Sequence, residues 1–191
     1  MANLSYFQKV TKHWAVVLVG VAAVALVVGS ARADDSPMTG VWKPKELQFS
    51  YVGMTTFYSC SGIEAKLATI LSQLGAAPKP IIFGYCDSGT GYPSRIGGAH
   101  LKFSVLEPGS KADQAIFGHW QKVTFERNPR LNLDDGDCEL FEQLSKTLIP
   151  LFSVRIIEAK FSCVPRDITS YSYKLELEVF MPIDERRGVM R

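Results

Sequence analysis

Two segments of the chain place their hydrophobic residues on one face of a helix. The apolar positions are Ile63, Leu67, Ile70, Leu71 and Leu74 in the first segment, and Phe141, Leu144, Leu148, Leu151 and Phe152 in the second. Glycine and proline then predict where each helix ends. Gly75 is expected to close the first helix, and Pro150 to kink or stop the second.

Residues before each segment fit helix starts. Ser61 and Glu64 match the S-x-x-E capping box, which predicts that they open the first helix. Asp137 is predicted to cap the second helix, because a carboxylate is favourable at that end.

Other stretches alternate between hydrophobic and polar residues, which is the period of a half-buried β-strand. The alternating stretches are 47–51, 99–105, 122–126, 157–163 and 173–181, and residues 81–86 form a short apolar run. The pattern therefore predicts six strands, with one sheet face buried beneath the helices.

The order of these elements occurs twice, as strand, helix, strand, strand. Trp42 and Trp120 precede Cys60 and Cys138 by the same number of positions, and each of these cysteines precedes a further one by a similar distance. We interpret this as an internal duplication. A strand-helix-strand crossover brings the helix start and the end of the second strand to one edge of the sheet. This geometry favours the disulfides Cys60–Cys86 and Cys138–Cys163.

The predicted fold class is α+β, a two-layer sandwich built from a duplicated β-α-β-β unit. About six mainly antiparallel strands would carry two helices on one face. Residues 42–183 would form one domain with repeats at 42–108 and 118–183. A flexible leader at 34–41 and a frayed tail at 184–191 would flank it.

The first 33 residues predict a secretory signal peptide. Lys9 and Lys12 precede an apolar run at 14–28, and an A-x-A cleavage site follows at 31–33. The apolar run is shorter than the about 20 residues of a membrane-spanning helix, so an uncleaved anchor is the less favoured alternative. We therefore expect a periplasmic or secreted protein without a stable membrane anchor.

Charge and cysteine usage agree with export. The chain has 21 basic and 19 acidic residues, and removal of residues 1–33 would take away three basic residues and no acidic one. The near-neutral remainder lacks the basic footprint of a nucleic-acid-binding protein. All four cysteines lie in this remainder, as expected in an oxidising compartment.

No catalytic or metal-binding pattern is present in the sequence. His100 and His119 have no ligands at metal-site spacing. The acidic run at 134–139 lacks the twelve-residue calcium-loop pattern. There is no C-x-x-C pair, which favours structural over redox-active disulfides. We expect no cofactor and no metal.

Two loops are candidates for binding. The glycine-rich segment at 87–98 offers Tyr92 and Arg95, and the entry to the first helix offers Thr55, Thr56 and Tyr58. If the topology is right, both loops lie at the edge of the sheet that carries the first disulfide. A plain connection between strands is the alternative for the glycine-rich segment.

Three runs of sequence resemble a family of uncharacterised exported proteobacterial proteins. They are WKP at 42–44, YVGMTTFYSC at 51–60 and DCEL at 137–140. The resemblance covers most of the chain after the signal peptide and implies a periplasmic or secreted bacterial protein. It implies no activity and no catalytic residue.

The leading hypothesis is a non-enzymatic protein that binds a periplasmic protein or an envelope component through its disulfide-bearing edge. One alternative is an enzyme with dispersed residues, most concretely a thiol-disulfide oxidoreductase. The other is a structural subunit of an envelope assembly.

Overall fold

The computed structural model describes residues 38–87, 91–109, 115–167, 169 and 171–183, which all belong to one compact unit, Arg32–Arg191. The predicted signal peptide with its cleavage site, the first part of the predicted leader (residues 34–37) and the predicted tail at 184–191 lie outside the described residues. The strands are β1 (Met38–Val52), β2 (Ala77–Cys86), β3 (Ile96–Pro108), β4 (Ile116–Phe125), β5 (Val154–Ser162) and β6 (Ser172–Pro182). The helices are α1 (Cys60–Gln73) and α2 (Cys138–Thr147), with short 3₁₀ turns at Pro129–Leu131, Asp135–Asp137 and Ile149–Leu151.

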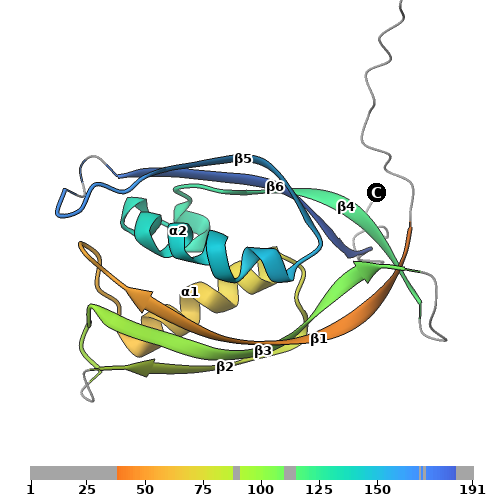
Figure 1. Cartoon of the computed structure of the whole chain (residues 1–191), viewed down its shortest axis with the longest axis horizontal. Helices are drawn as coiled ribbons and strands as arrows, with labels where there is room; N and C mark the ends of the chain where they lie inside the picture. The colour runs from red at the N-terminus through yellow and green to blue at the C-terminus, as the bar shows by residue number, and fades with distance from the viewer. Residues whose placement is uncertain (1–37, 88–90, 110–114, 168, 170, 184–191) are drawn as a thin grey trace, which may run out of the picture. The chain divides into compact units, whose positions relative to one another are not determined.

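The six strands form one sheet in the order β2-β3-β1-β4-β6-β5, and every neighbouring pair is antiparallel. Figure 1 shows the sheet curving so that β2, β3 and β1 face β4, β6 and β5, with α1 and α2 between them. The predicted α+β architecture is confirmed. The core consists of the apolar residues that the helical and alternating patterns place on one side of each element. The buried faces of both helices pack against the inward residues of the strands.

Each half has the crossover that the sequence predicts. β1 and β2 both pair antiparallel with β3, so they run parallel to each other with β3 between them. In the second half, β4 and β5 flank β6 in the same way. The predicted disulfides are confirmed, with Cα–Cα distances of 5.6 Å for Cys60–Cys86 and 5.7 Å for Cys138–Cys163.

A short strand pairing joins the two halves. β1 meets β4 through Met38↔Gly118, Thr39↔Phe117 and Gly40↔Ile116. The prediction of a flexible leader is therefore wrong for residues 38–41, which pair with β4 or β3. A Cβ atom on Gly40 or Gly118 would lie 2.7 or 2.6 Å from the Phe180 ring, so both positions require glycine. Each glycine stands two residues before a tryptophan, Trp42 or Trp120.

The structure corrects the predicted helix starts. Ser59, not Ser61, caps α1, because its hydroxyl accepts a hydrogen bond from Gly62 N at 3.1 Å. Glu64 instead accepts from Gly84 N on β2 at 2.6 Å. Asp137 makes no side-chain cap to α2, and its carboxylate is used elsewhere. The predicted ends are confirmed: Gly75 follows α1 with φ +72°, and Pro150 lies in the 3₁₀ turn after α2.

Most strands are longer than the alternating stretches of the sequence, and β2 and β3 extend into segments that were expected to be loops. β2 begins at Ala77 rather than at residue 81, and a register shift separates Ala77 from Ile81. β3 begins at Ile96, so the last three residues of the expected loop at 87–98 are strand. Local proline and glycine content suggested loops there, but pairing with β3 and β1 extends both strands.

Candidate functional site

The two candidate binding loops lie side by side at the disulfide-bearing edge. Gly53 N donates to Arg95 O at 2.7 Å, and Arg95 Nε donates back to Gly53 O at 3.3 Å. Tyr58 forms an isolated β-bridge with Ser94. The segment that enters α1, residues 53–59, is therefore tied to the β2–β3 connection.

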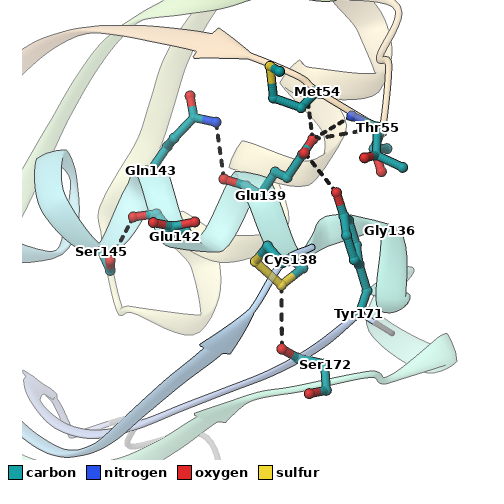
Figure 2. The surroundings of a disulfide bond; sticks show 12 residues. Met54, Thr55, Gly136, Cys138, Glu139, Glu142, Gln143, Ser145, Tyr171 and Ser172 are labelled. Atoms are coloured by element: carbon teal, nitrogen blue, oxygen red, sulfur yellow. Dashed lines mark hydrogen bonds between the residues drawn. A yellow bond between two sulfur atoms is a disulfide. The ribbon is translucent and has the colours of Figure 1, made fainter. Parts of the chain in front are cut away.

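Glu139, in the first turn of α2, holds this segment from the second half of the chain. Its Oε2 atom accepts from the backbone N–H groups of Met54 (3.0 Å), Thr55 (3.2 Å) and Thr56 (3.3 Å). Figure 2 shows the Glu139 side chain leaving α2 next to Cys138 and pointing toward Met54 and Thr55. Consecutive N–H groups converging in this way form an anion-binding concavity. Here the anion is part of the protein.

Tyrosine hydroxyls complete the environment of Glu139. Tyr171 O–H donates to Glu139 Oε1 at 2.7 Å, and Tyr51 O–H lies 3.3 Å from Oε2. Burial alone would raise the pKa of Glu139, but the hydrogen bonds from Tyr171 and from the backbone outweigh it and hold that pKa below its ordinary value. Glu139 is therefore an ionised structural anchor.

The side-chain amide of Gln143, on the same helix, makes two hydrogen bonds with the end of β1. Gln143 Oε1 accepts from Val52 N at 3.0 Å, and Gln143 Nε2 donates to Val52 O at 3.0 Å. This side chain makes the two bonds that a neighbouring strand would make. The backbone of residues 52–56 is thus fixed along most of its length by α2.

A buried ion pair lies beside the Glu139 contacts. Lys66 of α1 and Asp137 are both almost inaccessible, and Lys66 Nζ lies 2.6 Å from Asp137 Oδ2. Tyr58 O–H donates to Asp137 Oδ1 at 2.5 Å, and Lys66 also donates to Asn132 O. Burial and the adjacent Asp137 charge raise the pKa of Tyr58 far above its ordinary value. These groups are all paired with one another, which gives them a structural role.

Of the predicted binding residues, the side chains of Tyr58 and Thr55 make hydrogen bonds within the protein, and the hydroxyl of Thr56 is buried. Tyr58 is buried on Asp137. Thr55 Oγ1 accepts from Arg166 N at 2.6 Å, which links the segment to the β5–β6 connection. Thr56 Oγ1 is buried with no hydrogen-bond partner in the described part of the chain. The polar groups of Tyr58 and Thr56 are therefore buried, and the Thr55 hydroxyl is used in a contact within the protein.

The outward surface of the segment carries different side chains. Met54 is 44% exposed and Phe57 is 45% exposed. Arg95 lies between them, with its guanidinium carbon 5.9 Å from the Phe57 ring centre and Nη2 3.7 Å from Met54 Sδ. We call Met54, Phe57 and Arg95 the loop-tip surface. Arg95 was predicted from the sequence, as was Tyr92, which is 72% exposed on the same connection.

Sequence reasoning missed Met54 and Phe57. The available clue was that both are large apolar residues within a turn, outside the alternation of β1 and the helical face of α1. The contacts of Thr55 and Thr56 within the protein involve Arg166 and Glu139, which lie far from them in the sequence.

The structure also locates the residues that were considered for redox chemistry or metal binding. All four cysteines are in disulfides, and Cys138 is fully buried. His100 Nε2 lies 2.7 Å from Glu46 on the neighbouring strand. Within the described residues, no group of three or more histidine, cysteine or carboxylate side chains could hold a metal ion. Neither described helix has the length and apolar character needed to cross a membrane.

Comparison with protein-family models, with curated proteins and with solved structures gives no match. The function therefore has to be inferred from the residues of this chain.

Proposed function

We propose that this protein is an exported, non-enzymatic binding protein that recognises a partner protein through the loop-tip surface. The observation that carries the proposal is the exposure of Met54 and Phe57, with Arg95 between them, on a segment whose backbone is fixed from behind by Glu139. Methionine, aromatic residues and arginine are enriched in protein interfaces. The proposed partner surface is apolar with an acidic group opposite Arg95.

The rigid support of the segment favours binding over a passive connection. A loop that is ordered before binding loses less conformational entropy when a partner docks. Glu139 and Gln143 fix its backbone, while the Tyr58–Ser94 bridge and the first disulfide hold its neighbours. The apolar side chains are thus presented on a preformed scaffold, as recognition loops often are.

Export is part of the proposal. It is supported by the apolar N-terminal sequence with its A-x-A site and by two disulfides that each close a long loop. The proposed location is the periplasm or the extracellular medium.

A site-specific photo-crosslinker tests the partner proposal. Placed at Phe57 in the exporting cell, it is expected to capture a discrete protein, while the same group at Phe117 does not. Phe117 is a suitable control because it is 62% exposed at the β1·β4 pairing, away from the candidate loops. Capture at both positions or at neither would contradict the proposal.

Binding by the purified partner then tests the surface itself. Phe57→Ser and Arg95→Glu are expected to weaken its affinity about tenfold or more, as for residues at the centre of an interface. Phe117→Ser should leave the affinity unchanged. Equal affinities for all four proteins would show that the crosslink reports proximity alone. A partner that binds only when the disulfides are reduced would instead favour thiol-disulfide exchange.

A further inference from the structure

A cavity lies at the far end of β2 from the disulfide-bearing edge. Its volume is about 590 Å³, and it adjoins the start of β2 and the middle of β1 and β3. This volume is within the usual range of small-molecule sites. The lining residues are Pro44, Lys45, Glu46, Ala77, Lys79, Ile81, Lys102, Phe103 and Ser104.

An irregularity of β2 opens this cavity. Ala77 pairs with Ser104 and Ile81 pairs with Lys102, so three residues of β2 bulge opposite the single residue Phe103. Two of the three, Pro78 and Pro80, have no backbone N–H to donate to β3. The prolines therefore account for the bulge, and the loss of pairing leaves space between the two strands. Bulges of this kind often occur beside functional sites.

The cavity combines an apolar wall with excess positive charge. Most of its lining surface is apolar, and three lysines line it against one carboxylate. Lys45 pairs with Glu107 at 2.8 Å, and Lys102 pairs with Glu46 at 3.4 Å. Lys79 has no ion-pair partner among the residues that the structure describes. After these internal pairs, one lysine charge is left for a ligand.

We propose that the cavity binds a small monoanionic amphiphile, namely a carboxylate attached to an aliphatic or aromatic body. The apolar body would lie against Ile81, Phe103 and Ala77, and the carboxylate would face Lys79. A ligand with one negative charge matches the single lysine that is not neutralised. This site is separate from the loop-tip surface, so it does not depend on the proposed function.

Calorimetric titration of the protein, as isolated from the expressing cell, tests the site with three probes. Decanoate is used below its micelle-forming concentration, 1-decanol provides the same chain without charge, and acetate provides the charge without the chain. Decanoate is expected to bind, 1-decanol to bind about fivefold more weakly because it loses one exposed charge contact, and acetate to give no measurable heat. Absence of decanoate binding, or equal binding of decanol, would overturn the proposal.

Matched variants locate the binding. Lys79→Gln is expected to weaken decanoate about fivefold and to leave decanol unchanged, whereas Lys160→Gln on the opposite edge strand changes neither. Ser104→Tyr should fill the cavity and abolish binding of both decanoate and 1-decanol. Ser162→Tyr, on β5 like Lys160, should leave the binding of both ligands unchanged. Circular dichroism establishes that each variant is folded. Equal decanoate affinity in the two lysine variants, or decanoate-induced amide shifts at the loop-tip surface instead of Ala77 and Phe103, would refute the site.

Discussion

The starts of the two helices occupy corresponding places in the two halves of the chain, but they carry different chemistry. Around the first cysteine of each half stand Ser59 and Ser61 in one case and Asp137 and Glu139 in the other. Ser59 caps its own helix. Asp137 and Glu139 reach instead to groups of the first half, namely Lys66, Tyr58 and the backbone of residues 54–56.

The difference shows how two similar units become one domain. The strands, the helices and the disulfides are arranged alike in both halves, and the helix and the disulfide of each half involve residues of that half alone. The environment of the buried carboxylates Asp137 and Glu139 involves both halves, because most of their hydrogen-bond donors belong to the first half. The asymmetric residues at α2 therefore create both the interface between the halves and the rigid loop of the proposed binding surface.

The largest change in stability is expected from removing Lys66, the cation that faces Asp137. Lys66→Met should lower the free energy of unfolding by about 4 kcal/mol, because a buried carboxylate loses its charged partner. Lys146→Met, on the exposed face of α2, should change it by less than about 0.5 kcal/mol. Urea unfolding measures both. Similar stabilities for the two variants would mean that Asp137 is accessible to water.

Removal of each disulfide tests whether the two bonds stabilise the fold equally. Replacement of Cys60 and Cys86, or of Cys138 and Cys163, by alanine should cost about 3.5 kcal/mol, because the closed loops are of similar length. The second pair should cost somewhat more, since Cys138 is fully buried and its truncation leaves a cavity. Calorimetric melting measures the two losses. A first-pair variant with an unchanged melting temperature and lost partner binding would instead indicate a functional disulfide.

Glu139→Gln sharpens the contrast between the two helix starts. The neutral amide accepts weaker hydrogen bonds than a carboxylate, so a loss of about 2 kcal/mol is expected. Glu142→Gln on the same helix removes only an exposed pair with Lys146 and should cost less than about 0.5 kcal/mol. Hydrogen exchange at Met54, Thr55 and Thr56 should accelerate in the first variant alone. Unchanged exchange at these amides would refute the anchoring role.

The smallest expected effect is the acid dependence that Glu139 adds. Its pKa in the folded protein is below the value of 4.5 for a free carboxyl, so ionisation stabilises the fold above that pH. The contribution is lost as the pH falls through the lower folded pKa. The stability difference between the wild type and Glu139→Gln should therefore narrow below pH 4.5. A constant difference down to about pH 3 would show that the charge contributes nothing.

Periodic patterns in the sequence predicted the framework well. β6 alternates from Tyr173 to Met181 with its apolar residues buried, and the predicted face of α1 is buried from Ile63 to Leu74. The disulfide pairing followed from the crossover rule. These features were predicted correctly because each depends on neighbours within one half of the chain.

Contacts between the two halves of the chain could not be predicted in the same way. The sequence does not show that Glu139 accepts hydrogen bonds from the amides of residues 54–56, or that residues 38–40 pair with β4. A local rule assigned Asp137 as a cap, whereas burial next to Lys66 and Tyr58 determines its role. Likewise, the predicted capping box at Ser61 is wrong: Ser59 caps α1, and Glu64 accepts a hydrogen bond from Gly84 N on β2.

The order of the disulfides along the chain has a consequence for biosynthesis. Cys60 pairs with the next cysteine to emerge, Cys86, and Cys138 pairs with the one after it, Cys163. An oxidant that joins cysteines consecutively as they leave a translocation channel would therefore produce the native connectivity directly. If the chain is exported as proposed, its maturation should need a thiol oxidase but no disulfide isomerase.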